Sequence, residues 1–350
     1  MKREAWSQEI VFFNKEGYFS ELLQTLPLAK HSIELEVYIF EFDRLGREVL
    51  DALLAASQRG VRVRVVVDGL GSFFWIKAIR ERLLGSRVEL RVFHPFSVLS
   101  RAFAQVNRRL HRKVCLIDHQ IAFVGSFNIS DRAHRDTGVR LMGPPLRTLW
   151  EAFEFLWQKR FPFTRRKVQG LGLVRLNESK RMRRNCNHDL TRRIREAKER
   201  IWITNAYFVP PFFLLKALCL VALRGIEVKL LVPAKSDHLY MKWLTETYYQ
   251  TLILSGIRVF EYQGLFLHAK SILIDETFCI VGSTNLNHRS LIHDLEVDVV
   301  LSLPATKKVL QSQFQIDLEN SREITHFDLG KTNIFVRLIQ WFLRFFRFWA

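Results

Sequence analysis

The stretch His111-Arg112-Lys113-Val114-Cys115-Leu116-Ile117-Asp118 decides how this chain folds, because its pattern of His, Lys and Asp occurs a second time. The second copy is His268-Ala269-Lys270, with Asp275 five residues later. A Gly-Ser turn and an Asn follow in register, as Gly125-Ser126-Phe127-Asn128 and Gly282-Ser283-Thr284-Asn285. A single His-x-Lys pair would be weak evidence, because lone histidines are commonly core or surface residues. Two matched copies indicate a duplicated architecture that carries one chemistry.

The residues between Lys and Asp are apolar in both copies, which predicts buried strands over 110–118 and 267–275. Residues two apart on a strand share a face, so each His should project together with the Lys of its own motif. Histidine and lysine beside hydroxyl and amide donors are the ingredients of a phosphodiester-transfer site. The candidate phosphate-binding residues are Ser126, Asn128, Ser283 and Asn285.

Asp118 and Asp275 complete the two motifs and are included among the catalytic candidates with His111, Lys113, His268 and Lys270. Asp118 lies an odd number of residues beyond Lys113, so it should face away from the histidine at the strand end. Holding the turn is therefore the favoured role for Asp118.

The duplication extends well beyond the motifs. Matching strands are expected at 33–40 and 201–208, at 61–67 and 226–232, and at 88–93 and 257–262. Helical patterns that end at Gly60 and Gly225 separate the first two pairs. This alternation predicts an α/β fold of two duplicated halves, each a mixed β-sheet flanked by helices. The expected boundaries are 1–159 for the first half, 160–188 for a basic linker, 189–325 for the second half and 326–350 for a C-terminal amphipathic helix.

These residues resemble the phospholipase D superfamily and, within it, the bacterial cardiolipin synthase branch. Besides the two motifs, the resemblance rests on Glu36-x-Tyr38-x-Phe40, on Asp68-Gly69-x-Gly71-Ser72 and on Thr204-Asn205-Ala206-Tyr207-Phe208. It covers residues 10 to 305. One departure from the branch is the short segment 129–134 before Arg135-Asp136-Thr137, which puts the shape of the acceptor pocket in doubt.

The resemblance implies that the two halves pack about a pseudo-twofold axis where both motifs meet. It further implies that His111 is the nucleophile and His268 the general acid and base, although the sequence alone does not break this symmetry. The lysines would supply the positive charge, so no metal or other cofactor is expected. Asp136 and Glu296 occupy matching positions and are expected to orient the imidazoles, the alternative being surface salt bridges.

The formal charge of +18, from 53 Lys and Arg against 35 Asp and Glu, predicts an anionic partner, either nucleic acid or an acidic membrane. The C-terminal run Ile334 to Ala350 favours the membrane, because its few polar residues fall on one narrow face of a helix. Docking of this helix on the protein's own core is the alternative. The expected membrane-contacting residues are Arg337, Trp341, Arg344, Arg347 and Trp349. Phe73-Phe74-Trp75 fits a lipid-facing loop and ordinary core equally well.

The sequence therefore predicts a membrane-associated transphosphatidylase of the cardiolipin synthase type, with phosphatidylglycerol as substrate and a phosphohistidine intermediate. Cysteines without paired spacing and the lack of a secretory leader predict a peripheral enzyme on the cytoplasmic face of a bacterial inner membrane. A nuclease of the same superfamily is the alternative, and a noncatalytic membrane-binding protein is a third. Nucleic acid is not expected as a partner, because an aromatic tail has no purpose on DNA. The oligomeric state stays open.

Overall fold

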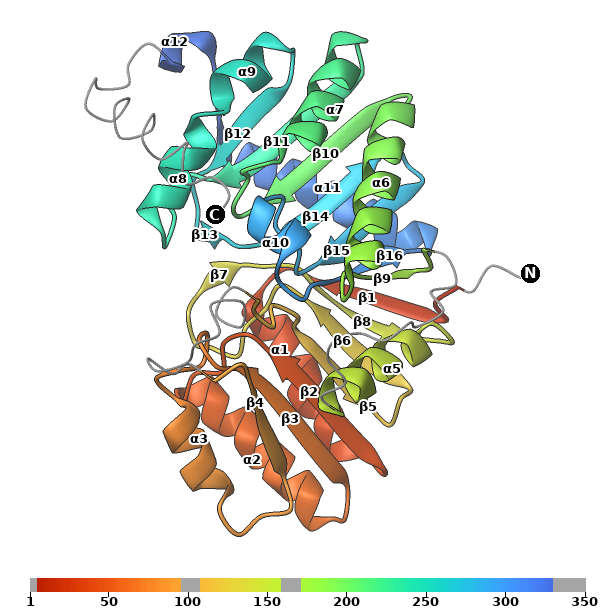
Figure 1. The fold of residues 1–350 in the computed structure, drawn as a ribbon, viewed down its shortest axis with the longest axis vertical. Coiled ribbons are helices and arrows are strands. Elements are labelled where there is room, and N and C mark those ends of the chain that lie inside the picture. Colours follow the sequence, from red (N-terminus) through yellow and green to blue (C-terminus); the bar gives the residue numbers. More distant parts are fainter. Residues whose placement is uncertain (1–4, 96–107, 159–170, 330–350) are drawn as a thin grey trace.

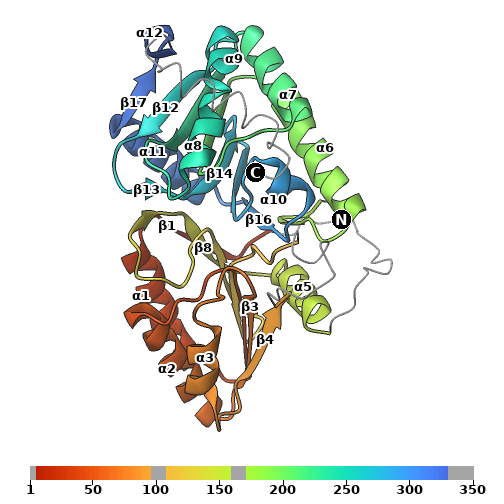
Figure 2. The same ribbon diagram turned by 60° about the vertical axis from the view of Figure 1, so that its left-hand side comes forward.

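The computed structural model describes residues 5–95, 108–158 and 171–329. The two halves are stacked along the long axis of the molecule, with the first half below the second (Figures 1 and 2). The sheet of the first half has the order β1-β8-β6-β5-β2-β3-β4. Its strands are β1 (Gln8–Phe12), β2 (Ser32–Val37), β3 (Arg62–Asp68), β4 (Glu89–Phe93), β5 (Val114–Ile117), β6 (Ile121–Gly125) and β8 (Gly138–Met142).

The sheet of the second half has the order β17-β12-β11-β10-β14-β15-β16-β9. Its strands are β9 (Val174–Leu176), β10 (Arg200–Asn205), β11 (Glu227–Pro233), β12 (Arg258–Tyr262), β14 (Lys270–Ile274), β15 (Phe278–Gly282), β16 (Val297–Leu301) and β17 (Ser321–Ile324). In each sheet three neighbouring strands are parallel, β2-β3-β4 and β10-β11-β12, and an antiparallel pair carries the motif, β5-β6 and β14-β15. The predicted mixed sheets and their duplication are thereby confirmed.

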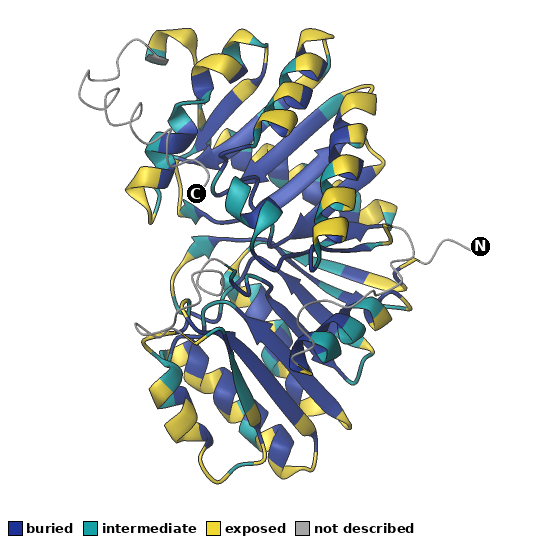
Figure 3. Cartoon of the chain, viewed as in Figure 1, coloured by how far each residue is buried: buried dark blue, intermediate teal, exposed yellow. Residues whose placement is uncertain are grey.

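Helices cover the outer face of each sheet and expose their polar sides, whereas the strands are buried (Figure 3). The first sheet carries α1 (Lys15–Thr25), η1 (Leu26–Leu28), α2 (Arg44–Gln58) and α3 (Ile76–Leu83). The second carries α6 (Lys180–Glu196), α7 (Phe212–Leu223), α9 (Tyr249–Leu254) and α10 (His288–Ile292). Side chains of Asn14, Asp43, Ser179 and Asn287 accept backbone N–H groups at the starts of α1, α2, α6 and α10.

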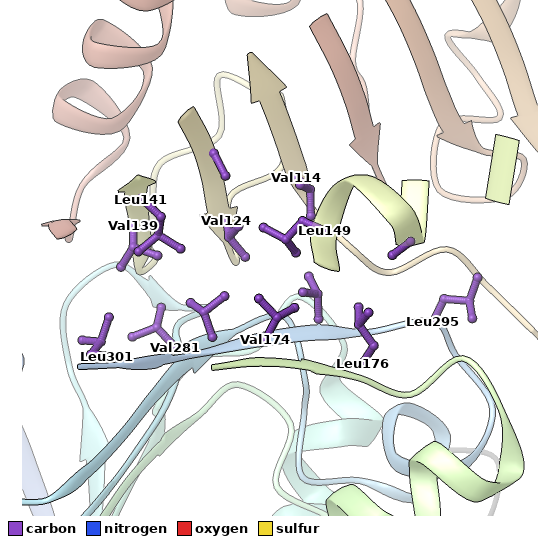
Figure 4. Close-up of a cluster of buried hydrophobic side chains, with 14 of the residues drawn as sticks. Val114, Val124, Val139, Leu141, Leu149, Val174, Leu176, Val281, Leu295 and Leu301 are labelled. Atoms are coloured by element: carbon purple, nitrogen blue, oxygen red, sulfur yellow. The ribbon is translucent and has the colours of Figure 1, made fainter. Parts of the chain in front are cut away.

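The inner faces of the two sheets share one hydrophobic core. Val124 and Val139 of the first sheet and Val281 and Leu301 of the second belong to it, and they face one another across the junction (Figure 4). Helices α5 (Leu146–Trp157) and α11 (Pro304–Glu319) pack into the same core. Because this core draws on both halves, their relative position is fixed by burial of apolar surface.

The remaining elements are a short parallel pair at the junction, β7 (His134–Arg135) with β13 (Phe266–Leu267), and the helices α8 (Leu239–Glu246) and α12 (His326–Leu329). Within the described ranges, none of the helices combines the length and the apolar composition that a membrane crossing requires.

One boundary predicted from the sequence needs correction. The expected linker 160–188 is too long, because Val174–Leu176 forms β9 on β16 and α6 begins at Lys180. Strand pairing and the Ser179 cap outweigh the basic composition of this segment. The expected C-terminal helix lies outside the described residues from position 330 onward, as does the part of the linker from 159 to 170.

Candidate active site

Each motif histidine is held by the opposite half of the chain. The His111 N–H donates to the Leu295 carbonyl at 2.9 Å, and the His268 N–H donates to the Arg135 carbonyl at 2.9 Å. In both cases the accepting residue directly precedes the predicted orienting carboxylate. The strand predicted over 110–118 begins only at Val114, because the backbone before it bonds across the junction and not within the sheet.

The two histidines line one cavity of about 380 Å³ at the junction of the halves. Asn128, Asn285 and Asp136 line the same cavity. The structure therefore brings both motifs to a single site, as the resemblance implied. Ser130, Arg132 and His134 also line it, so the short segment 129–134 forms part of the cavity wall.

The carboxylates pair with the histidines crosswise. His111 Nδ1 lies 3.0 Å from Glu296 Oε2, and His268 Nδ1 lies 2.7 Å from Asp136 Oδ1. Both carboxylates are buried, so neither forms a surface salt bridge. A carboxylate at Nδ1 favours the tautomer with the proton on Nδ1, which leaves the Nε2 lone pair for chemistry. Each half thus supplies the orienting group for the other half's histidine.

The serines do not fit the phosphate-binding role expected of them. The Ser126 hydroxyl donates to Asp136, and the Ser283 hydroxyl donates to Glu296. Both serines are fully buried and also accept the backbone N–H of the residue that directly follows the carboxylate. A hydroxyl that donates its one proton to a carboxylate cannot also donate it to a phosphate oxygen. Ser126 and Ser283 therefore hold the two carboxylates in position.

The two asparagines lie at the cavity. Asn128 Oδ1 accepts the Ile39 N–H at 3.2 Å, which fixes the side-chain amide beside the segment that follows β2. Asn285 is buried and lines the cavity, and its Oδ1 has no hydrogen-bond partner within the described residues. An amide in this position is suited to donating to a phosphate oxygen.

The motif aspartates are remote from the chemistry, so their inclusion among the catalytic residues is corrected. Asp118 accepts the backbone N–H groups of residues 30 to 32, and Asp275 accepts those of residues 198 to 200. Both adopt positive φ values of 52° in the turn after the motif strand. The favoured turn-holding role of Asp118 fits these bonds, and Asp275 has the same role in the second half.

The motif lysines are buried beside the histidines. Lys113 Nζ donates to the His111 carbonyl at 2.7 Å and lies 5.3 Å from the centre of the Tyr38 ring. Lys270 Nζ donates to the His268 carbonyl. Burial lowers the pKa of Lys113 to about 8 and that of Lys270 to about 7, although nearby carboxylates oppose the shift. An anion in the cavity would favour both charged forms.

The two carboxylates differ in their electrostatics. Burial raises the pKa of Glu296 to about 7, and the nearby Lys113 only partly offsets it. Burial acts in the same direction on Asp136, but His268 and Lys270 hold the pKa of Asp136 well below its usual value. Burial and the motif lysines lower the pKa of both motif imidazoles, so both are neutral before an anion binds.

Three cavity residues were missed as site candidates in the sequence. The Tyr38 ring lies 5.0 Å from the His111 ring, and the Tyr207 ring lies 6.5 Å from the His268 ring. Their matching places after β2 and β10 were the available signal. The His134 ring lies 5.7 Å from that of His268, and no pattern in the sequence singled it out.

Ligand atoms of His134, Asp136 and His268 lie within 4.8 Å of one another, and no other group within the described ranges has comparable metal-ligand geometry. Asp136 already accepts from His268 through one oxygen, and its other oxygen lies 4.0 Å from His134 Nδ1. A metal ion here would therefore compete with the bond that orients His268.

Comparison with known proteins agrees with this geometry. The family model described as "Cardiolipin synthase, PLD-like domain" matches residues 22–157 and 190–318. The chain belongs to this phospholipase D-like family. A cardiolipin synthase of Alkalihalophilus pseudofirmus is 34% identical over 93% of this chain and 69% of its own length. A cardiolipin synthase of Clostridium perfringens is 29% identical over 94% of this chain and 74% of its own length.

Among solved structures, the phosphatidylserine synthase of Haemophilus influenzae superposes with a TM-score of 0.71. It is 14% identical, and the match covers 97% of this chain and 92% of that one. At this identity the likeness concerns the fold, and it extends over both phospholipase D-like halves.

A buried ion pair fixes the entry to the first motif. The Arg109 guanidinium bonds to Asp68, with Nη2 2.7 Å from Oδ1, and both side chains are almost fully buried. Asp68 Oδ2 also accepts the Leu110 N–H at 2.9 Å, and Asp294 accepts the Arg109 N–H at 2.9 Å. These bonds tie the residues directly before His111 to the end of β3.

We expect Arg109→Met to destabilise the fold by about 3–5 kcal/mol, because it leaves the Asp68 carboxylate buried without its partner. Urea unfolding followed by circular dichroism measures the loss. Adding Asp68→Asn should restore part of it, since the uncompensated charge is removed. The control is Arg82→Met, which breaks an exposed pair with Asp51 and should cost less than about 1 kcal/mol. Equal losses in the two variants would contradict the prediction.

Proposed function

We propose that this protein is a transphosphatidylase of the cardiolipin synthase type. It moves a phosphatidyl group from phosphatidylglycerol to a hydroxyl of a second phospholipid. The observation that carries the proposal is the crossed pairing of two imidazoles with two buried carboxylates around one cavity. Cardiolipin synthases among its relatives, matched over more than nine tenths of this chain, support the choice of a lipid substrate.

In the first half of the reaction His111 Nε2 attacks the phosphorus of phosphatidylglycerol. The bond from phosphorus to the headgroup glycerol oxygen breaks. His268, which takes up a solvent proton at Nε2 when the anionic substrate binds, gives that proton to the oxygen, so free glycerol leaves. The product is a phosphatidyl group on His111. Lys113, Lys270 and the two cavity asparagines stabilise the negative charge that builds on the nonbridging oxygens.

In the second half the neutral His268 accepts the proton of the incoming hydroxyl. The hydroxyl oxygen attacks phosphorus, and the bond from His111 Nε2 to phosphorus breaks. When the hydroxyl belongs to a second phosphatidylglycerol, the product is cardiolipin. Water in place of the lipid hydroxyl would give phosphatidic acid.

The opposite pKa shifts of Asp136 and Glu296 support His111 as the nucleophile and His268 as the general acid and base. Asp136 is ionised throughout the physiological range, because His268 and Lys270 hold its pKa low. An ionised partner stabilises an imidazolium, which suits the residue that carries a proton in both half-reactions. His111 needs only its Nε2 lone pair, which an ionised Glu296 secures by accepting the Nδ1 proton.

A bell-shaped pH profile of kcat/KM follows from these groups. Burial raises the pKa of Glu296 to about 7, so activity should rise with pH as this carboxyl ionises. The pKa of Lys270 is lowered to about 7 and that of Lys113 to about 8, so activity should fall as the ammonium groups lose their protons. We expect a narrow maximum close to pH 7, measured with phosphatidylglycerol in detergent micelles. His134→Asn is the control, because it removes another cavity imidazole. The loss of activity at low pH should persist in this variant. A flat profile would contradict the assignment.

Peripheral attachment to an anionic membrane, on the cytoplasmic face of a bacterial inner membrane, belongs to the same proposal. The charge of +18 and the aromatic, arginine-bearing run from 334 to 350 support it. We expect a truncation after residue 329 to weaken binding to anionic vesicles, measured by co-sedimentation. Unchanged binding would assign this run to the protein's own core.

The substrate class is tested by incubating the purified protein with phosphatidylglycerol and, separately, with plasmid DNA, in the absence of added metal. Cardiolipin and glycerol should form in the first mixture, and the DNA should stay intact. Cleavage of DNA without lipid turnover would overturn the proposal and favour a nuclease.

A further inference from the structure

Two exposed apolar loops flank the opening of the active site. The first lip, residues 70–75, follows β3 and leads into α3. It exposes Phe74 at 83%, together with Leu70 and Phe73. The second lip, residues 235–240, follows β11 and leads into α8. It exposes Leu239 at 63%, together with Tyr240. Figure 1 places α3 and α8 on the same side of the molecule, one in each half, with β7 and β13 between them.

Both lips are continuous with the cavity. Leu70 of the first lip and Asp237, His238 and Tyr240 of the second are among the cavity-lining residues. The apolar surface therefore begins inside the opening and continues outward onto Phe74 and Leu239. Large exposed apolar side chains that adjoin a binding site commonly mark a contact surface.

Each lip is fastened to the tyrosine that lies beside its own half's histidine. In the first lip the Ser72 hydroxyl donates to the Tyr38 carbonyl at 3.0 Å. A side chain at Gly71 would collide with that same carbonyl, so the loop passes directly over Tyr38. In the second lip Asp237 accepts the Tyr207 hydroxyl at 2.6 Å. The exposed side chains are thus held at fixed places relative to both catalytic imidazoles.

The cavity is too small to hold the whole of the proposed lipid substrates. Pockets of about 300–1,000 Å³ enclose a single drug-sized ligand, and this cavity of about 380 Å³ lies near the lower limit. It accommodates the headgroup and phosphate that react, but not the acyl chains of two diacyl lipids. The chains must then stay in the bilayer while phosphorus reaches the histidines, which requires the bilayer surface to lie against the opening.

We propose that the two lips are the membrane-docking surface of the active site, with Phe74 and Leu239 inserted among the lipids of an anionic bilayer. This inference rests on the proposed function and names the surface through which its substrates enter. Exposed basic residues accompany the lips, namely Lys77 and Arg80 on α3, Arg132 on the cavity wall and Lys235 on the second lip. Cations beside inserted apolar groups complement an anionic leaflet.

The experiment compares Phe74→Asp and Leu239→Asp with a matched control, Leu28→Asp. Leu28 is 69% exposed and adjoins the Asp118 turn, at the opposite end of the first sheet from the cavity. Binding is measured by co-sedimentation with vesicles of phosphatidylglycerol and phosphatidylethanolamine. Transfer is measured on the same vesicles and on a short-chain, water-soluble phosphatidylglycerol.

We expect each lip variant to lose at least about tenfold in vesicle affinity, since a carboxylate replaces a side chain that enters the apolar region. Transfer on vesicles should fall in parallel, whereas turnover of the soluble substrate and all properties of Leu28→Asp stay at the wild-type level. Vesicle binding equal to wild type would overturn the inference. So would equal losses on vesicles and soluble substrate, because the lips would then act within the cavity.

Two further outcomes separate this inference from others. If Phe74→Asp turns a dimer into a monomer in sedimentation velocity without changing vesicle binding, the lips contact a second copy of the chain and the inference fails. If the wild-type protein turns over neither lipid, the proposed function fails. A lip-dependent loss of vesicle binding would in that case still support the docking surface.

Discussion

Replacing His111 with alanine is expected to abolish turnover of phosphatidylglycerol, lowering kcat by about 10⁴-fold or more, as loss of a catalytic nucleophile does in other enzymes. His268→Ala should lower it by about 10²–10⁴-fold, the usual contribution of a general acid and base. The assay is release of glycerol from phosphatidylglycerol. His31→Ala is the control, because this exposed imidazole lies beside the Asp118 turn and its loss should leave turnover unchanged.

A second substrate separates the two roles. When the leaving group is p-nitrophenolate, departure needs no proton, so His268→Ala should recover most of its activity in the first half-reaction. His111→Ala should stay inactive, because no leaving group replaces the missing nucleophile. A mass increase equal to one phosphatidyl group should appear on wild-type protein and be absent from His111→Ala. Rescue of His111→Ala and not of His268→Ala would reverse the assignment.

The fold was predictable because the duplicated pattern is local. Apolar runs on matched spacings indicated β2 and β10, β3 and β11, and β4 and β12. Burial on both faces explains why these strands appear in the sequence as nearly continuous apolar runs. The same reasoning failed at residues 174–176 and from 180 onward, where a basic composition hid β9 and the start of α6.

The site was predictable in its members but not in its pairing. Matched positions indicated Asp136 and Glu296 as partners of histidines, yet only the packing of the halves decides which histidine each one meets. That packing depends on the core that the two sheets share, and this core is built from many separate segments of the chain. The sequence also did not show that Ser126 and Ser283 face the carboxylates, although each of these contacts lies within one half.

The crossed pairing leads to the second large effect. Asp136→Asn and Glu296→Gln should each lower transfer from phosphatidylglycerol by up to about 10⁴-fold, the loss seen when an orienting carboxylate of a catalytic triad becomes an amide. An amide that presents its N–H₂ to Nδ1 favours the wrong imidazole tautomer. Both residues are buried, and the isosteric amides preserve their shape, so the folded structure should persist by circular dichroism.

The p-nitrophenyl substrate also tests whether each carboxylate acts on the histidine of the opposite half. Asp136 belongs to the first half but contacts His268 at 2.7 Å, so Asp136→Asn should be rescued by p-nitrophenolate, as His268→Ala is. Glu296 belongs to the second half but contacts His111 at 3.0 Å, so Glu296→Gln should resist rescue, as His111→Ala does. Pairing within each half predicts the opposite outcome for both variants. Rescue of Glu296→Gln together with failure of Asp136→Asn would therefore disprove the crossed arrangement, because each carboxylate would be acting through the histidine of its own half.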